Sequence, residues 1–141
     1  MMEPSFVLDT SVTIAFGLSD ESSVYAENVL ESLEHDMAIV PLIWALEVGN
    51  VILKAERLKR ISRADGHLFL DLLRDLPILM ETEPLHVLLG EIVPLARQEQ
   101  LSTYDAAYLH LAMRSGLSLA TEDQALQAAA KRCGVGLYLY D

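Results

Sequence analysis

The sequence predicts one α/β domain, in which a central parallel five-stranded sheet is flanked by helices on both faces. Short apolar segments typical of strands alternate with longer amphipathic segments typical of helices, and this order is characteristic of a parallel sheet. The chain has 141 residues, which suffice for one domain with a real core and are too few for two comfortable ones. Hydrophobic residues make up 52% of it, so a packed core is expected rather than disorder. We therefore expect residues 1–141 to form a single domain.

Five short segments rich in apolar and β-forming residues predict the strands of this sheet. The first reads "SFVLD", and "MAIVP", "PILME", "LSLAT" and "GLYLY" follow it along the chain. These segments occupy residues 5–9, 37–41, 77–81, 117–121 and 136–140. In sheets of this kind, ligands bind beyond the carboxyl ends of the strands, so functional residues are expected directly after them.

Six amphipathic segments predict the helices. Pro41 suits the first turn of the second helix, Ser62 caps the third, and Gly116 ends the fifth. Gly90 and Pro94 predict a kink in the fourth helix. The predicted helices cover residues 20–35, 41–58, 62–76, 83–100, 102–115 and 122–133.

The composition also excludes several classes of protein. No stretch free of Asp, Glu, Lys and Arg exceeds ten residues, so no membrane-spanning helix is expected. The first residues, "MMEPSF", lack the basic region of a secretory signal. Cys133 is the single cysteine, which rules out an internal disulfide. We expect a cytoplasmic protein that does not act at a membrane.

Glu47 is the most unusual residue of the chain, because it interrupts the apolar stretch "PLIWALEVGNVILK". On a helix, Ile43 and Val51 lie on the same side as Glu47, and no Lys or Arg lies within one turn. A buried carboxylate without a partner costs several kcal/mol. The sequence therefore predicts that Glu47 has a partner from elsewhere in the fold.

Three aspartates occupy positions at which functional side chains are expected. Asp9 ends the first strand, Asp123 follows the fourth, and Asp105 lies in the opening turn of a helix. Each also has a purely structural interpretation, because Ser102 and Asp105 have capping-box spacing and acids in a first helical turn favour the helix dipole. Asp123 would follow a cap at Thr121, and Asp9 would cap the segment after it. Capping cannot account for Glu47, which lies beyond the first turn.

Together, the four acids predict a metal site. If Asp9, Glu47, Asp105 and Asp123 converge at one edge of the sheet, they cannot all be ionised without cations. Oxygen ligands without histidine or cysteine suit Mg²⁺ or Mn²⁺, which can bind phosphate oxygens and activate water. In this interpretation Glu47 contacts a metal or a metal-bound water. The residues expected to orient the ligands from behind are Ser11 and Thr121.

At these residues the sequence resembles PIN-domain ribonucleases, in particular the VapC-type toxins of prokaryotic toxin–antitoxin pairs. "VLDTSV" matches the first family acid at Asp9 and the hydroxyl residue at Ser11. "ALEVGNVI" matches the family glutamate at Glu47, and "LSTYDAAYLHLA" places an acid at Asp105. "LATEDQAL" contains Thr121 and the last acid, Asp123. The four segments occur in the family order and span almost the whole chain.

The resemblance implies a fold, an activity and partners. The family fold is a parallel five-stranded sheet flanked by helices, usually as a homodimer. The implied activity is Mg²⁺- or Mn²⁺-dependent endonucleolytic cleavage of RNA, inhibited by a cognate antitoxin protein. His110 departs from the family pattern, because a small or apolar residue is expected there, and we interpret it as packed or surface-lying rather than catalytic.

Other interpretations remain open from the sequence. A receiver-type signalling domain needs adjacent acids after the first strand and a lysine at the end of the fifth, whereas Thr10 and Ser11 follow Asp9 and Lys131 precedes the fifth strand. A haloacid-type phosphatase needs Asp at the position of Ser11. A binding module without activity, whose acids only cap helices, is a third alternative, against which Glu47 argues.

A cluster of basic residues contrasts with the overall charge. The net charge of −11 argues against non-specific binding of nucleic acid. Five of the ten basic residues nevertheless lie within a ten-residue window, so either a solvated helix end or a contact surface for RNA or an acidic antitoxin segment is predicted there. This basic window consists of Lys54, Arg57, Lys59, Arg60 and Arg63.

Overall fold

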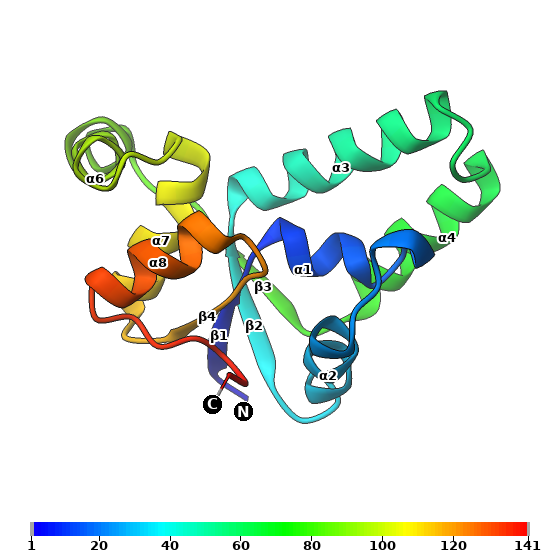
Figure 1. Ribbon diagram of the computed structural model, residues 1–141, viewed down its shortest axis with the longest axis horizontal. Helices are drawn as coiled ribbons and strands as arrows, with labels where there is room; N and C mark the ends of the chain where they lie inside the picture. Colours follow the sequence, from blue (N-terminus) through cyan, green and yellow to red (C-terminus); the bar gives the residue numbers. More distant parts are fainter. Residues whose placement is uncertain (1, 141) are drawn as a thin grey trace.

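The centre of the molecule is a four-stranded parallel sheet (Figure 1). The computed structural model describes residues 2–140. The strands lie in the order β3-β2-β1-β4, so the first strand of the chain is central. Their bounds are β1 Pro4–Leu8, β2 Met37–Pro41, β3 Ile78–Glu81 and β4 Ser118–Ala120. The predicted α/β class with a parallel sheet is confirmed, and the carboxyl ends of all four strands lie at one edge.

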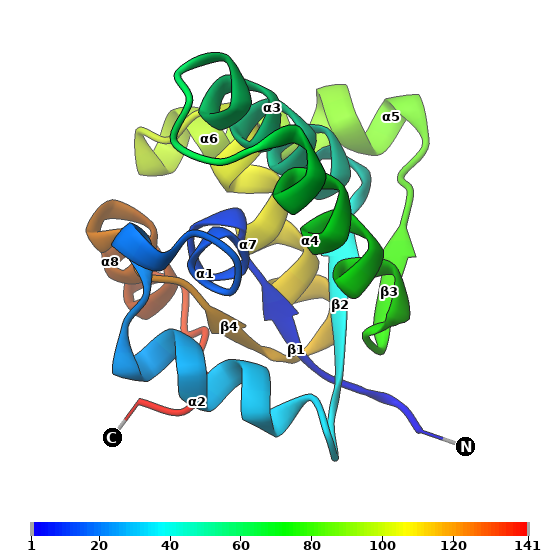
Figure 2. The same ribbon diagram turned by 90° about the vertical axis from the view of Figure 1, so that its right-hand side faces the viewer.

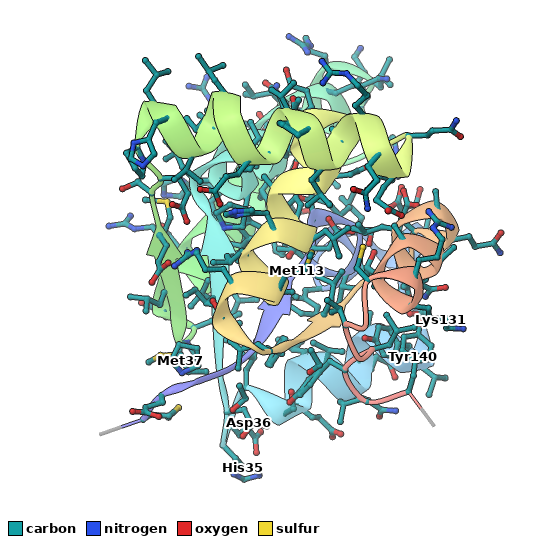
Figure 3. The ribbon with its side chains drawn as sticks, turned by 90° about the vertical axis from the view of Figure 1, so that its left-hand side faces the viewer. His35, Asp36, Met37, Met113, Lys131 and Tyr140 are labelled. Atoms are coloured by element: carbon teal, nitrogen blue, oxygen red, sulfur yellow. The ribbon has the colours of Figure 1, made fainter. Side chains whose placement is uncertain are left out.

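The predicted fifth strand at residues 136–140 is wrong. This segment contributes one parallel bridge, between Leu137 and Leu119 of β4. Leu139 then adopts φ 58°, in the left-handed region, which turns the chain out of the extended conformation that a strand needs. Aromatic packing fixes the segment instead, because the Tyr138 ring stacks on Phe6 with centroids 3.8 Å apart. The hydroxyl of Tyr140, which is labelled in Figure 3, accepts a hydrogen bond from Gln127 of α8 at 3.0 Å.

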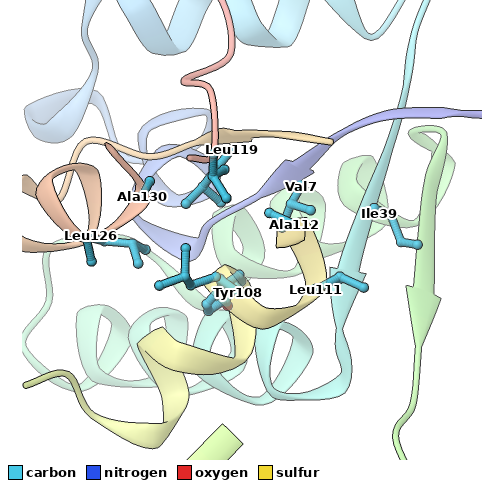
Figure 4. Close-up of a cluster of buried hydrophobic side chains, with 11 residues drawn as sticks. Val7, Ile39, Tyr108, Leu111, Ala112, Leu119, Leu126 and Ala130 are labelled. Atoms are coloured by element: carbon cyan, nitrogen blue, oxygen red, sulfur yellow. The ribbon is translucent and has the colours of Figure 1, made fainter. Parts of the chain in front are cut away.

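Alternating side chains of the strands face two different layers of helices. Val7 and Ile39 point into a cluster formed with α7 (Thr103–Ser115) and α8 (Gln124–Arg132) (Figure 4). Phe6 and Leu8 point to the opposite side, toward α1 (Thr10–Ala15) and α2 (Val24–Ser32). This period of two matches helices on both faces. The predicted flanking of the sheet is therefore confirmed.

The helix α1 was not predicted from the sequence, and two further helices, α3 (Leu42–Arg57) and α4 (Arg63–Asp75), pack on it. Four of its six residues are β-branched, a composition that disfavours a helix in isolation. Ile14 is nevertheless buried against Val48 of α3 and Phe69 of α4. The α3–α4 hairpin lies over α1 and extends away from the sheet (Figures 1 and 2). The predicted helix at 20–35 is also shorter, because a 3₁₀ turn, η1 (Ser19–Glu21), precedes α2.

The predicted kinked helix at 83–100 is a composite. It consists of α5 (Leu85–Val87), a π-helical turn η2 (Leu88–Ile92) and α6 (Val93–Glu99). The backbone N–H of Val93 bonds to the carbonyl of Leu88, five residues back. A π turn directly before Pro94 accommodates a residue that has no N–H to donate.

The remaining helix boundaries follow local capping. Ser62 accepts a hydrogen bond from the N–H of Asp65 at 3.0 Å, and Ser102 accepts one from Asp105 at the same distance. Gly116 ends α7 with φ 67°, as predicted from its place in the sequence. Within residues 2–140, no helix combines the length and the apolar character required to span a membrane.

Candidate active site

Asp9 lies at the carboxyl end of β1 and caps α1. Its carboxylate is 5% exposed and is surrounded by donors. Oδ1 accepts from the backbone N–H of Thr10 at 2.8 Å, whereas Oδ2 accepts from Ser11 Oγ at 2.8 Å and from Thr121 Oγ1 at 2.7 Å. Burial, followed by the charges of Asp105 and Glu47, raises the pKa of Asp9 to about 6, although the hydrogen bonds from Thr121 and Ser11 lower it in part.

The two hydroxyl residues beside Asp9 are themselves held by backbone groups after β4. Ser11 Oγ accepts from the N–H of Glu122 at 3.1 Å, and Thr121 Oγ1 accepts from the N–H of Asp123 at 3.1 Å. Both hydroxyls have a donor behind them, so each can direct its own proton to Asp9. The residues that the sequence predicted to orient acidic ligands therefore contact Asp9 directly.

Glu47 is half-buried in the second turn of α3, and its partners are hydroxyl groups. Its Oε1 accepts from Tyr108 OH at 2.6 Å and from Thr10 Oγ1 at 3.0 Å. No Lys or Arg of the described residues forms an ion pair with it. Sequence reasoning missed both partners, although Tyr108 follows Asp105 by three residues and therefore shares its helix face. Burial, followed by the hydrogen bond to Glu47, raises the pKa of Tyr108, which keeps its proton.

Asp105 and Asp123 each lie where a helix begins. Asp105 lies in the first turn of α7, and its pKa is raised by burial and then by the charges of Asp123 and Glu47. Asp123 is itself the N-cap of α8, because its Oδ1 accepts from the N–H of Leu126 at 3.0 Å. The predicted cap at Thr121 is wrong, because Thr121 instead faces Asp9.

The structure brings the four acids into one electrostatic group. The charges of Asp105 and Glu47 contribute to the raised pKa of Asp9. The charges of Asp123 and Glu47 contribute in the same way to the raised pKa of Asp105. They come from the end of β1, from α3, from the first turn of α7 and from the N-cap of α8, at the carboxyl edge of the sheet. The group is negative, and none of these acids pairs with a cationic side chain in the part of the chain that the structure describes.

The chemistry of this group fits a hard divalent cation. All four side chains offer carboxylate oxygens, and their mutual repulsion would be relieved by positive charge between them. In residues 2–140 no three His, Cys, Asp or Glu side chains stand together at the spacing of a closed metal site. The acids are instead engaged by hydroxyl and backbone donors.

His110 lies outside this group. It is buried on α7, its Nε2 is 3.0 Å from Glu91 Oε1, and its Nδ1 has no hydrogen-bond partner among the described residues. It lines an apolar groove of about 360 Å³, which is formed by the start of α3, the segment after β3, η2 and α7. Of the two placements expected for His110, packed or surface-lying, the structure shows the packed one.

The basic window lies at the end of α3, in the connecting turn and at the start of α4. All five of its side chains are exposed, at the tip of the α3–α4 hairpin (Figure 1). Arg60 forms ion pairs with Asp20 at 2.7 Å and Glu21 at 3.5 Å, so part of its charge is already neutralised. The other four basic residues form no ion pair with any residue between 2 and 140.

Comparison with known proteins places the chain in a family. Residues 6–132 match the family model of the PIN domain. The sequence is 34% identical over 85 residues to Exonuclease VapC9 of Pyrobaculum aerophilum. This match covers 60% of the chain and 61% of that relative, so the chain spans less than two thirds of the relative's length.

Solved structures share the fold at low sequence identity. PAE2754 of Pyrobaculum aerophilum superposes with a TM-score of 0.71 at 24% identity, over 89% of this chain and 79% of that one. VapBC2 of Rickettsia felis, in a structure bound to a DNA fragment from its promoter, superposes with a TM-score of 0.66 at 15% sequence identity, over 96% of this chain and 98% of that one. FitAcB of Neisseria gonorrhoeae superposes with a TM-score of 0.61 at 20% sequence identity, over 94% of this chain and 96% of that one.

Membership of this family sets aside the receiver-type and phosphatase interpretations of the fold. The family model covers both ends of the acidic group, from the strand that precedes Asp9 to the helix that Asp123 caps. The chain therefore belongs to the PIN-domain family and is a distant homologue of VapC proteins.

Proposed function

We propose that this protein is a Mg²⁺- or Mn²⁺-dependent endoribonuclease and the toxin of a type II toxin–antitoxin pair. The observation that carries the proposal is the group of four carboxylates at the carboxyl edge of the sheet, which repel one another and lack a cationic partner among the described residues. Membership of the PIN family and the similarity to a VapC protein support it.

In this proposal Asp9, Glu47, Asp105 and Asp123 hold the metal. A bound Mg²⁺ or Mn²⁺ polarises the scissile phosphate and lowers the pKa of the attacking water. Ser11 and Thr121 keep Asp9 oriented through their hydrogen bonds to Oδ2. The acidic edge repels RNA when no cation is present, so substrate binding depends on the cation and on basic residues elsewhere.

We assign the basic window to contacts with RNA phosphates or with an acidic segment of the antitoxin. Arg57, Lys54, Lys59 and Arg63 are exposed and have no ion-pair partner in residues 2–140. Arg60 is the exception, because Asp20 and Glu21 engage it. The likeness to VapBC2 and FitAcB supports the antitoxin assignment.

We further propose that two copies of the chain associate through the apolar groove. Leu46 and Leu89 line it and are 60% and 62% exposed, an unusual exposure for large apolar side chains that share one groove. A homodimer, which the resemblance implies, would cover this surface.

The deciding experiment is incubation of purified protein with circular and linear forms of one RNA, in Mg²⁺ and in EDTA. An endonuclease opens the circle and leaves 5′-phosphate and 3′-hydroxyl ends, whereas a strict exonuclease, as the relative is named, cuts only the linear form. Asp9→Asn is the inactive control. Cleavage that is undiminished in EDTA, or 2′,3′-cyclic ends, would overturn the metal mechanism. Mapping of cut sites on total cellular RNA would then identify the target sequence.

A further inference from the structure

Three oxygen atoms from distant parts of the chain meet inside the candidate active site. They are Glu47 Oε1, Tyr108 OH and Thr10 Oγ1. Tyr108 OH lies 2.6 Å from each of the other two, and Thr10 Oγ1 lies 3.0 Å from Glu47 Oε1. Contacts at 2.6 Å are at the short end for hydroxyl hydrogen bonds, which is expected where the acceptor is a carboxylate.

The protons of this group have a preferred arrangement. Thr10 and Tyr108 each contribute one hydroxyl proton, whereas an ionised Glu47 only accepts. The short contact between Tyr108 and Glu47 takes the tyrosine proton. The proton of Thr10 then goes either to Glu47 Oε1 or to the closer Tyr108 oxygen, and the second choice forms a chain in which each bond strengthens the next.

The two oxygens of Glu47 are therefore not equivalent. Oε1 accepts from Tyr108 and lies within hydrogen-bond distance of Thr10, whereas no hydrogen bond to Oε2 is formed by any residue from 2 to 140. Asp9 differs, because donors occupy both of its oxygens. Thr10 links the two acids, since its backbone N–H bonds to Asp9 and its hydroxyl contacts Glu47.

The tyrosine is placed by the rigid core rather than by the site. Tyr108 is fully buried, and its ring packs with Val7, Leu111 and Leu126 between α7, α8 and the sheet (Figure 4). Only the hydroxyl extends from this apolar cluster toward Glu47. A ring held in a close-packed core cannot follow a movement of Glu47, so it acts as a fixed reference point for that carboxylate.

We infer that Tyr108, together with Thr10, is a positioning residue that holds Glu47 by Oε1 and leaves Oε2 as the oxygen available to a divalent cation. This inference rests on the proposed function, because it assumes that Glu47 binds the metal. It adds a second role for α7, which then supplies both the acid Asp105 and, one turn later, the hydroxyl that orients Glu47. Partners that orient a ligand in this way typically change metal affinity 10- to 100-fold.

The test is Mn²⁺ affinity, measured by titration calorimetry and by the loss of the free Mn²⁺ electron paramagnetic resonance signal. Tyr108→Phe keeps the buried ring and removes only the hydroxyl. We expect its Kd for Mn²⁺ to rise about 10-fold or more. The Mn²⁺ concentration for half-maximal cleavage should rise in parallel, while the rate at saturating Mn²⁺ changes less. Thr10→Val tests the second hydroxyl and should shift Kd in the same direction, even if Tyr108→Phe fails to fold.

Tyr138→Phe is the matched control. The hydroxyl of Tyr138 also donates to a carboxylate, that of Asp36, at 2.7 Å. Asp36 precedes β2, at the amino edge of the sheet and away from the candidate site (Figure 3). This variant loses a comparable bond and should bind Mn²⁺ as the wild type does. Equal weakening in Tyr138→Phe would reduce the role of Tyr108 to general stability and overturn the inference.

A double-mutant comparison separates the possible failures. If Tyr108 acts through Glu47, adding Tyr108→Phe to Glu47→Gln should change Kd much less than it does in the wild type. A wild-type protein that binds Mn²⁺ with a Kd unchanged by Tyr108→Phe and Thr10→Val overturns this inference and leaves the proposed function intact. A wild-type protein that binds no Mn²⁺ overturns both.

Discussion

At the scale of single residues, the behaviour of this protein is dominated by carboxylates placed close together in a half-buried edge. Asp9 is the most enclosed of them, and burial with neighbouring negative charge raises its pKa to about 6 from the ordinary 3.8. The folded state therefore holds a proton on Asp9 at pH values where the unfolded chain does not. Stability must then depend on pH in a direction opposite to that of an acid in an ion pair.

The first prediction follows from this sign. Without metal, the ionised carboxylate of Asp9 lowers the free energy of unfolding, and this loss of stability is fully present above about pH 6. It disappears as the pH falls through about 6 toward 4, because Asp9 takes up a proton in the folded state. Between pH 7 and pH 5 the free energy of unfolding should rise by about 1 kcal/mol. Urea unfolding in EDTA at pH 7 and at pH 5 measures this change in the free energy of unfolding. In Asp9→Asn the change between the two pH values should be smaller. A wild-type protein that loses stability over this interval contradicts the assignment.

The second prediction concerns Asp105, whose pKa is raised by burial and by Asp123 and Glu47. Asp105→Asn removes one charge from the group and leaves the cap at Ser102, which bonds to the backbone N–H. The variant should melt higher than the wild type in EDTA and should lose nuclease activity.

Mn²⁺ should stabilise the wild type more than this variant. At a Mn²⁺ concentration of a hundred times its Kd, the free energy of unfolding of the wild type should rise by about 2.7 kcal/mol and its melting temperature by roughly 5–10 °C, and both should rise less in the variant. A wild-type melting temperature that is indifferent to Mn²⁺, with a less stable and active variant, would exclude a shared site.

At the scale of elements, the α3–α4 hairpin depends on a close approach between α1 and α4. A Cβ at Gly17 would collide with the aromatic ring of Phe69, which also packs on Ile14 and Leu18. Only a glycine lets the chain after α1 pass under this ring. The hairpin is held at its tip by Arg60, which reaches Asp20 and Glu21 of η1.

The third prediction tests this contact. Gly17→Ala should lower the free energy of unfolding by about 1–3 kcal/mol, because the ring has to move within a packed core. Gly49→Ala is the matched control, since no atom lies within 4 Å of a Cβ added there in the middle of α3. It should stabilise the protein by about 0.5–1 kcal/mol through helix propensity. Equal effects of the two substitutions in urea unfolding would argue against a specific collision.

The fourth prediction concerns the basic window on the same hairpin. Charge reversal of Lys54 and Arg57 should weaken binding of single-stranded RNA and lower the slope of log K against log salt by about 1.4, because each phosphate contact contributes about 0.7. Lys131→Glu, on α8, makes the same kind of charge change outside the window. Fluorescence anisotropy over a salt series would measure both. An unchanged slope after reversal of Lys54 and Arg57 would make the window ordinary solvated surface.

At the scale of the whole molecule, the fold leaves an apolar groove beside α3 uncovered. The helix α3 buries Val48, Ile52 and Ala55 on one side and exposes Leu42 and Leu46 on the other. The long apolar stretch of its sequence therefore forms two apolar surfaces. One packs in the core, and the other is exposed to solvent.

The fifth prediction is that this groove joins two copies of the chain. Leu46→Glu or Leu89→Glu should convert a dimer into a monomer, because each places a charge in the apolar contact. Leu68→Glu is the control, since Leu68 is 65% exposed on α4 and does not line the groove. Light scattering after size-exclusion chromatography reports the mass. A wild-type monomer at micromolar concentration, or an intact dimer in the groove variants, would contradict the proposal.

Features that depend on local pattern could be predicted from the sequence. The alternation of strand and helix predicted the parallel sheet, and the rule for strand ends predicted that Asp9 and Asp123 lie at the same edge, which follows from the parallel pairing of β1 with β4. Helix caps at Ser62 and Ser102 were also predictable, since they involve residues three positions apart.

Features that depend on contacts between distant segments could not be predicted in this way. Glu47 meets Thr10 and Tyr108 across 37 and 61 positions of the chain, and no periodicity encodes such a pair. The helix α1 forms against its β-branched composition because burial under α3 outweighs propensities that amount to less than about 1 kcal/mol per residue. The segment at 136–140 has the composition of a strand, but in the fold it turns at Leu139 and Tyr138 stacks on Phe6 of the first strand, a contact that local composition does not encode. Local pattern is short-ranged, whereas burial and pairing of polar groups are settled by whichever segments the whole fold brings together.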